Sequence, residues 1–248
     1  MKNPIYVVRS HKFDPAIVEM VHQLARDVGP ENVIVVYDDT KIKLPSGGVS
    51  AVDAVLTERR DIVTLTYSTA DATVFNRFHV SMWHNGHEPL MLIGRAVKYD
   101  YDYVVMLEYD VRCLGNFKTA FAKVDDIDTD YLANYMGDHV KYPDLLWDSF
   151  VGDESRIPPM DERRVGLFAV VRCSKRLVDA LYANRDVYDA YCEIYVPTLA
   201  RQLGMSVREF PPEILGQFAP MTFKDIRGWS EYIKVNAKDD RLYHAIKD

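Results

Sequence analysis

An uninterrupted apolar run, Val104 to Leu107, ends at two carboxylates, Glu108 and Asp110. Such a run predicts a strand that is buried on both faces, as in a parallel sheet covered by helices. On an extended backbone, residues separated by one position point to the same side, so the two carboxylates are expected together. Ligands of open α/β sheets bind beyond the carboxyl ends of the strands. The pair is therefore a candidate site for a hard divalent cation that carries a phosphate. The alternative is that it only solvates the strand end and begins a turn.

Strands and helices alternate before this run. Strands are predicted at residues 5–8, 33–36 and 62–65, and helices at 52–56, 76–83 and 90–97. Another helix is predicted from Asp14-Pro15, which supply a cap and a first-turn proline, to Gly29-Pro30. The alternation predicts a doubly wound α/β sheet, whose first βαβ unit has a right-handed crossover.

The second half of the chain is less regular. Helices are predicted at residues 117–124, 175–181 (after a cap at Ser174) and 191–203, and strands at 131–135, 165–171 and 207–210. Residues 139–159 are predicted to form a loop, and the residues from Met221 onward a polar, aromatic tail. No repeat or convincing linker divides the chain, so residues 1–248 are predicted to form one domain.

Composition narrows the possible partners. The 248 residues are 48% apolar and 27% charged, as in an ordinary globular protein, and the net charge is -7. This charge argues against nucleic acid or an anionic membrane as the main partner. We expect no transmembrane segment, because no apolar run approaches the roughly 20 residues of a membrane span, and we expect no signal peptide. The three cysteines are far apart and never in a CxxC spacing, which indicates reduced thiols in a cytoplasmic protein.

Two common nucleotide-binding motifs do not occur in the sequence. No GxGxxG follows the first strand and no GxxxxGK[ST] occurs anywhere, so a dinucleotide-binding Rossmann fold and a P-loop are poorly supported. The second predicted strand instead ends at Asp38-Asp39. Either carboxylate could accept a hydrogen bond from a ribose hydroxyl or a base N–H. The alternative is a pair of turn acids.

A strand–helix–strand start that ends in acid, followed by a mid-chain apolar strand that ends in an acidic triplet, resembles the GT-A class of nucleotide-sugar glycosyltransferases. The resemblance implies a Rossmann-like GT-A fold, with a central, mixed, mostly parallel sheet flanked by helices. It implies a nucleotide-sugar-binding half, residues 1–115, and an acceptor half with the C-terminal tail, residues 116–248. In this class a D-x-D motif holds Mn²⁺ or Mg²⁺ against the donor diphosphate. The matching triplet is Glu108-Tyr109-Asp110, which implies that Asp110 is a metal ligand and that Glu108 contacts ribose or the metal.

The C-terminal residues extend this resemblance. Some members of the class have a histidine near the C-terminus, followed by a lysine, where the tail folds over the diphosphate. The segment Tyr243-His244-Ala-Ile-Lys247 is similar, with Ala245 where a proline is often found. It implies that His244 is a metal ligand and that Lys247 meets phosphate. Imidazole together with carboxylates suits Mn²⁺ better than Mg²⁺. The alternative for His244 is an exposed side chain without a role.

A third match concerns the acceptor side. The run Tyr191-Cys-Glu-Ile-Tyr195 resembles the acidic helix of inverting members of the class. It implies that Glu193 takes the proton from the acceptor hydroxyl as this attacks the anomeric carbon of the sugar. The alternative is an ordinary solvated helix acid. Competing candidates for the base are Asp153, Glu154, Asp161 and Glu162.

Several other side chains are weaker candidates. Arg9 and Ser10, at the end of the first predicted strand, could contact the nucleotide, whereas Arg95 is better interpreted as a surface or ion-pair residue. Trp83 or Trp147 could stack on a sugar, although core packing explains most aromatic residues.

Together these matches imply a metal-dependent glycosyltransferase that moves a sugar from a nucleotide diphosphate donor to a hydroxyl of a carbohydrate or glycoconjugate acceptor. One alternative is a nucleotidyltransferase of related fold, although Arg9-Ser-His-Lys12 lacks the glycines usual after its first strand. Another is a non-catalytic nucleotide-sugar-binding module, for which the glutamate at 108 and the alanine at 245 leave room. The metal arrangement requires Asp110 and His244 to lie together in the fold.

Overall fold

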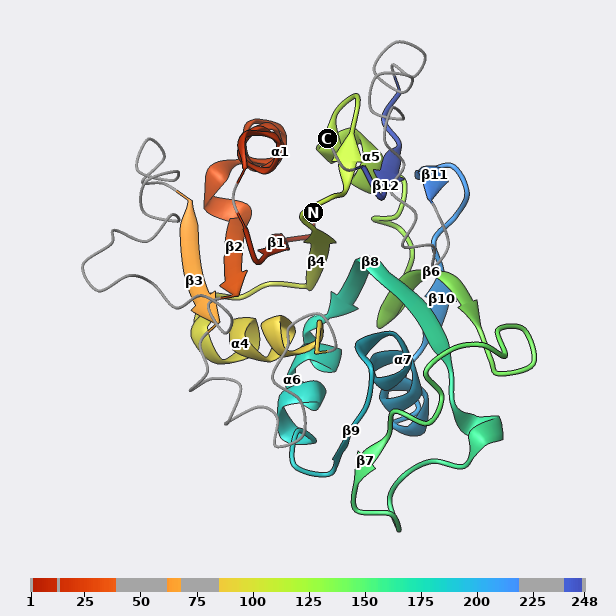
Figure 1. The fold of residues 1–248 in the computed structure, drawn as a ribbon. Coiled ribbons are helices and arrows are strands. Elements are labelled where there is room, and N and C mark those ends of the chain that lie inside the picture. Colours follow the sequence, from red (N-terminus) through yellow and green to blue (C-terminus); the bar gives the residue numbers. More distant parts are fainter. Residues whose placement is uncertain (1, 13, 39–61, 68–84, 219–238, 247–248) are drawn as a thin grey trace.

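The computed structural model describes residues 2–12, 14–38, 62–67, 85–218 and 239–246. Its centre is a seven-stranded sheet (Figure 1). In spatial order the strands are β10 (Val207–Glu209), β6 (Tyr131–Gly137), β8 (Val165–Ser174), β4 (Tyr103–Glu108), β1 (Pro4–Ser10), β2 (Val33–Asp38) and β3 (Val63–Tyr67). Within this sheet β8 is antiparallel to both of its neighbours, and the other pairs are parallel. This is the mixed, mostly parallel sheet that the GT-A resemblance implies.

The first βαβ unit forms as predicted. Asp14 accepts a hydrogen bond from the backbone N–H of Ile17 at 3.1 Å, and Pro15 occupies the first turn of α1 (Pro15–Val28). Gly29 ends the helix with a φ of +92°, a conformation that favours glycine. A short 3₁₀ helix, η1 (Pro30–Asn32), leads into β2, which pairs in parallel with β1. The local signals for this unit are thus sufficient to place its ends.

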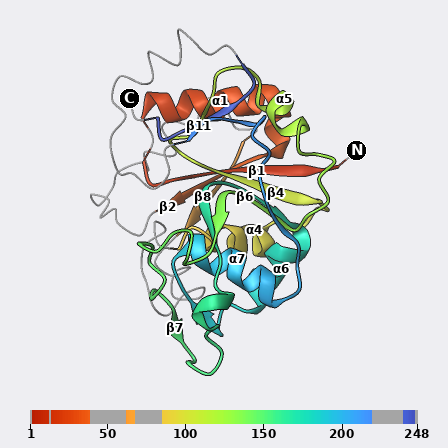
Figure 2. The ribbon, with the colours of Figure 1, turned by 90° about the vertical axis from the view of Figure 1, so that its right-hand side faces the viewer.

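Helices cover both faces of the sheet (Figure 2). Besides α1 they are α4 (Glu88–Ala96), α5 (Phe117–Ala122), α6 (Lys175–Ala183) and α7 (Cys192–Gln202). Along β4, Val104 and Met106 pack with α4, α6 and α7, whereas Val105 and Leu107 pack with α1 and α5. Each of these four side chains is fully buried, which stabilises the fold by about 1.5–3 kcal/mol per side chain relative to exposure. The prediction of a strand buried on both faces is confirmed.

In the second half of the chain, the buried carboxylate of Asp130 joins several elements by hydrogen bonds. Ser174 begins α6 by accepting from the backbone N–H of Leu177 at 3.1 Å, as predicted, and its hydroxyl donates to Asp130 at 2.8 Å. Arg176 and Ser206 also donate to Asp130. Burial favours a higher pKa for Asp130, but the hydrogen bonds from Arg176, Ser206 and Ser174 lower this pKa to about 2. The carboxylate therefore joins the start of β6 to α6 and to the residue before β10.

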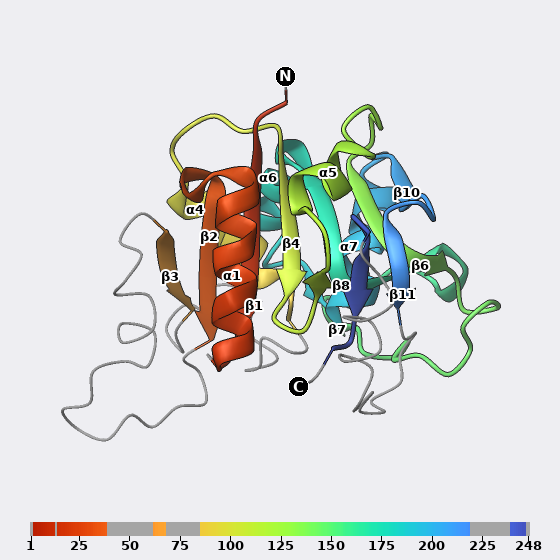
Figure 3. The same ribbon diagram turned by 90° about the horizontal axis from the view of Figure 1, so that it is seen from above.

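Two smaller sheets were not predicted from the sequence. One contains β11 (Leu215–Phe218), β12 (Leu242–His244) and β5 (Arg112–Cys113), and the other pairs β7 (Val151–Gly152) with β9 (Tyr188–Asp189). Residues 242–244 therefore form a strand within the segment that was predicted only as a polar, aromatic tail, and Leu242 and Tyr243 are buried. β11 and β12 lie on the side of the main sheet that α1 and α5 cover (Figures 1 and 2). Figure 3 views the molecule from this side and shows the strand order from β3 through β4 to β8.

Some predictions fall on residues that the structure does not describe. They are the helices at 52–56 and 76–83, Trp83, and the candidate site residues Asp39 and Lys247. The loop predicted at 139–159 contains β7 and is followed by a 3₁₀ helix, η2 (Met160–Glu162). In the described part of the chain, every helix is too short or too polar to span a membrane.

Candidate active site

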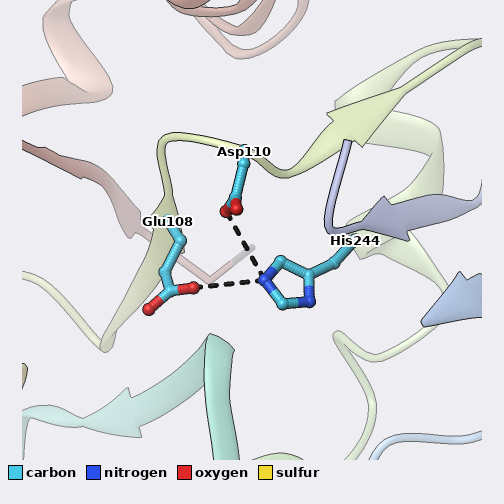
Figure 4. A group of neighbouring side chains, drawn as sticks. All are labelled: Glu108, Asp110 and His244. Atoms are coloured by element: carbon cyan, nitrogen blue, oxygen red, sulfur yellow. Dashed lines mark hydrogen bonds and ion pairs between the residues drawn. The ribbon is translucent and has the colours of Figure 1, made fainter. Parts of the chain in front are cut away.

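Glu108, Asp110 and His244 point toward one another at the end of β4 (Figure 4). His244 Nε2 lies 3.2 Å from Glu108 Oε2 and 3.4 Å from Asp110 Oδ1. One ligand atom from each residue lies within 4.8 Å of the other two. His244 is at least 134 positions along the chain from Asp110 and Glu108. The structure brings the three residues together, as the metal arrangement requires. Their role as metal ligands stays a prediction.

The two carboxylates converge for a reason other than the one predicted. β4 ends at Glu108, and the backbone N–H of Val111 donates to the Glu108 carbonyl at 3.1 Å, which closes a turn. Asp110 therefore lies on a turn and not on extended backbone. Asp110 is 5% exposed, so the alternative that it solvates the strand end is wrong, although the turn that this alternative included is present.

The small sheet brings His244 to this turn. β5 begins two residues after Asp110, and β12 pairs with it in antiparallel register, with Tyr243 opposite Arg112. The backbone N–H of Ile246 donates to the Asp110 carbonyl at 2.9 Å. The segment is also anchored upstream, where Asp240 Oδ1 accepts from the backbone N–H of Asn116 at 2.6 Å. His244 is therefore held beside the carboxylates by backbone pairing.

The donor set fits a divalent cation. Two carboxylates that lie close together repel each other, and a cation relieves this repulsion. One imidazole nitrogen with two carboxylate oxygens is a mixed set that suits Mn²⁺ better than Mg²⁺, which prefers oxygen and water. Glu108, Asp110 and His244 are the described residues that could hold such an ion.

The predicted donor-side residues lie in different surroundings. Arg9 is 6% exposed and pairs with Glu108 Oε1. The Ser10 hydroxyl bonds with the backbone of Lys12, in the turn that follows β1. Asp38 is buried at the end of β2, where its charge contributes to raising the pKa of the Glu88 carboxyl. The structure therefore brings Arg9 to the Glu108–Asp110–His244 group and gives Ser10 a local partner.

Glu193 is buried near the same group. It is 6% exposed, so the alternative of a solvated helix acid is wrong, and its Oε1 accepts from the backbone N–H of Phe168 at 3.1 Å. Burial raises the pKa of the Glu193 carboxyl, while the Phe168 N–H and the charges of Arg9 and His244 act in the opposite direction. The competing acids Asp153, Glu154, Asp161 and Glu162 are all exposed.

A pocket of about 290 Å³ adjoins the turn that carries Asp110. Its lining residues are Lys12, Asp14, Pro15, Ala16, Ile17, Tyr109, Arg112 and Ile246. The Lys12 ammonium lies 5.2 Å from the centre of the Tyr109 ring and 2.9 Å from Asp14. Tyr109 is the middle residue of the acidic triplet, so its position in the sequence was a signal from which a role in this site could have been predicted. Nothing in the sequence pattern signals Arg112 or Ile246.

A second buried polar cluster was also missed. His87 Nε2 lies 3.2 Å from Asp189 Oδ1, and the neighbouring Glu88 is fully buried, with no hydrogen bond from a described residue to either carboxylate oxygen. Burial, with the nearby charges of Asp189 and Asp38, raises the pKa of Glu88 to about 10. Glu88 is therefore a neutral acid at physiological pH.

Of the tryptophan candidates, Trp147 is buried in the core and donates to the Tyr142 carbonyl at 2.6 Å.

Comparison with solved structures identifies the fold. The galactosyltransferase LgtC, in complex with donor and acceptor sugar analogues, matches with a TM-score of 0.52 and 11% identity, over 98% of this chain and 87% of its own. The bifunctional glycosyltransferase WbbM matches with a TM-score of 0.51 and 11% identity, over 100% of this chain and 46% of its own. A 4-diphosphocytidyl-2C-methyl-D-erythritol synthase from Anaerococcus prevotii matches with a TM-score of 0.50 and 9% identity, over 84% of this chain and 86% of its own.

The chain spans about half the length of some of these proteins. It covers 46% of WbbM and 55% of the mannosyltransferase PcManGT from Pyrobaculum calidifontis, which matches with a TM-score of 0.49 and 12% identity over 85% of this chain. Comparisons of the sequence with family models and with curated proteins find no match. The likeness is therefore one of structure, and the protein has the GT-A fold of nucleotide-sugar glycosyltransferases.

Proposed function

We propose that the protein is a metal-dependent glycosyltransferase, which moves a sugar from a nucleotide diphosphate donor to a hydroxyl of a carbohydrate or glycoconjugate acceptor. The observation that supports this most is the meeting of Glu108, Asp110 and His244 at the carboxyl end of a central strand in a GT-A fold. Ligands of such sheets bind at this edge.

Glu108, Asp110 and His244 are the proposed ligands of Mn²⁺ or, less favourably, Mg²⁺. When bound, the ion supplies positive charge against the departing diphosphate. The protein holds the three ligands in place, because β12 pairs with β5 beside the turn that carries Asp110.

The nucleoside part of the donor is proposed to enter the adjoining pocket. Lys12 and Arg112 supply positive charge there, and Ile17 and Ile246 supply apolar surface for a base. Ile246, which follows β12, lines this pocket together with residues of the 1–115 half, which is consistent with a donor site that the C-terminal residues complete. Ser10, Asp38, Asp39 and Lys247 stay predicted donor contacts.

Glu193 is the proposed general base of an inverting transfer. It would take the proton from the acceptor hydroxyl, and the Phe168 N–H keeps one carboxylate oxygen in a defined position. A raised pKa suits this role, since general bases work best with a pKa near the operating pH. The Tyr191 side chain also hydrogen-bonds the Glu193 carboxylate.

A nucleotidyltransferase is the second candidate, because a synthase of that kind has a similar fold. The segment after β1, Arg9-Ser-His-Lys12, lacks glycine, which argues against it. The product distinguishes the two reactions. A nucleotidyltransferase releases pyrophosphate, whereas a glycosyltransferase releases a nucleoside diphosphate. A non-catalytic binding module would bind the nucleotide with Mn²⁺ and release neither.

The test is to incubate the full chain with Mn²⁺ and a panel of UDP- and GDP-sugars and to follow nucleoside diphosphate release. We expect D110A and H244A to lower the rate by at least about 100-fold, because each removes a ligand of the charge-stabilising ion. D126A, at an exposed aspartate, is the matched control and should keep the wild-type rate. Undiminished turnover of D110A would remove Asp110 from the mechanism.

A further inference from the structure

Arg9 and Glu108 are placed on the same face of the sheet by strand register. The two residues are partners in the parallel pairing of β1 with β4. Along β1, Ile5 and Val7 pack on the side of α4, α6 and α7, and Arg9 follows them in the same alternation. Its guanidinium consequently enters the protein under the candidate metal ligands and does not extend toward solvent.

The surroundings of Arg9 are shaped for a guanidinium. Its Cζ lies 5.4 Å from the centre of the Phe168 ring on β8. A Cβ atom at Gly86 would collide with Arg9 Nη1 and lie 3.0 Å from Cys192 Sγ, so a larger residue there would displace the guanidinium. Residues of β4, β8, α7 and the segment before α4 thus surround the guanidinium of Arg9.

The carboxylates of Glu108 and Glu193 both interact with the positive charge of Arg9. Glu108 uses its two oxygens differently: Oε1 pairs with Arg9, and Oε2 faces His244 Nε2 at 3.2 Å. On the other side, Glu193 is held by the Phe168 N–H, and the charge of Arg9 lowers the pKa of its carboxyl against the effect of burial. Arg9 therefore lies between a proposed metal ligand and the proposed base.

We propose that Arg9 is a positioning residue that turns one oxygen of Glu108 toward the metal position and makes cation binding depend on the diphosphate. This inference rests on the proposed function. A divalent ion by itself balances the charge of the two carboxylates, Glu108 and Asp110. Arg9 pairs with Glu108 directly, whereas Glu193 lies on the other side of Arg9, so the positive charge of Arg9 opposes the ion more than the charge of Glu193 favours it. Such a centre binds a cation weakly alone and more tightly once an anionic diphosphate is present, and this coupling is reciprocal.

The experiment compares R9M, which removes the charge at similar length, with R9K, which keeps the charge but loses the forked geometry. Mn²⁺ affinity is measured by electron paramagnetic resonance, without and with saturating UDP or GDP, after correction for Mn²⁺ bound to free nucleotide. In R9M we expect the loss of a buried charge to outweigh the loss of Glu108 orientation, so that Mn²⁺ alone binds about tenfold more tightly and the enhancement by nucleotide falls about tenfold. R9K should keep the wild-type enhancement.

Equal weakening of Mn²⁺ binding by R9M with and without nucleotide, or no change at all, would overturn the proposal. Thermal unfolding of each variant shows whether the fold is intact. If R9M does not fold, R9Q replaces it, because its amide can still donate to Glu108 without a charge. A wild-type protein that binds no Mn²⁺ under any condition contradicts the proposed metal dependence itself. Mn²⁺ binding with an unaltered enhancement in the uncharged variants contradicts only the role of Arg9.

Discussion

Two buried glutamates of this protein differ in what surrounds them. Glu193 accepts a backbone hydrogen bond and lies near the positive charge of Arg9, so its carboxylate form has partners. Glu88 receives no hydrogen bond from the part of the chain that the structure describes and lies near two other acids, so its neutral form is favoured. Glu193 is therefore suited to proton transfer, whereas ionisation of Glu88 would destabilise the folded protein.

For Glu193 the expected result is a change in the pH profile of sugar transfer. A base acts when ionised, so the wild-type rate should fall as pH decreases through the raised pKa, above the ordinary glutamate value of 4.5. E193Q should lower the rate by about 10²–10⁴-fold and abolish this acidic limb. The control is E213Q, at an exposed glutamate with no proposed role. A full rate in E193Q would exclude Glu193 as the base.

For Glu88 the expected result is a change in the pH dependence of stability. The folded state keeps Glu88 protonated up to a pKa of about 10, whereas the unfolded chain ionises it above about 4.5. This contribution to the free energy of unfolding is complete below the unfolded pKa and is lost as pH rises toward the folded one, by at most about 1.4 kcal/mol per pH unit.

E88Q should remove this loss, so that its stability relative to the wild type increases between pH 5.5 and pH 8.5. Urea unfolding at three pH values in this interval measures the difference, with E154Q as the control. Parallel stability curves for E88Q and the wild type would show that Glu88 ionises in the folded protein.

At the scale of elements, the candidate site depends on β12, which was not predicted. Local signals explain the elements that were: Asp14-Pro15 and Gly29 bound α1, Ser174 caps α6, and the apolar run 104–107 forms β4. β12 has three residues, and its partner β5 has two. Strands this short have no periodicity that a sequence reader can use, and they exist because tertiary pairing provides their hydrogen bonds.

The anchor of β12 gives a prediction about the metal site. D240A removes the acceptor of the Asn116 N–H, which should cost about 1–3 kcal/mol of stability and loosen the segment that carries His244. We expect Mn²⁺ affinity to fall about 10–100-fold, the effect usual for groups that orient metal ligands. Calorimetric titration measures the affinity, and D126A is the control. Wild-type affinity in D240A would mean that β12 stays in place without this bond.

At the scale of the whole molecule, the fold could be predicted from sequence and the close geometry of the site could not. Alternation of strands and helices, with acids at strand ends, was enough for a mostly parallel α/β sheet. The GT-A resemblance implied in addition that Asp110 and His244 meet. It did not reveal that Asp110 lies on a turn, that Arg9 turns inward to Glu108, or that a pocket forms beside Tyr109. These features arise from contacts between distant segments, which leave no local pattern.

The central claim is that this edge of the sheet holds one cation between two carboxylates and an imidazole. The most direct measurement is anomalous scattering from crystals of the full chain soaked with Mn²⁺ and a nucleoside diphosphate. The account predicts a peak between Glu108 Oε2, Asp110 Oδ1 and His244 Nε2, with the diphosphate in contact with it. A bound nucleotide with no peak at these three atoms, or a peak held by other residues, would contradict it.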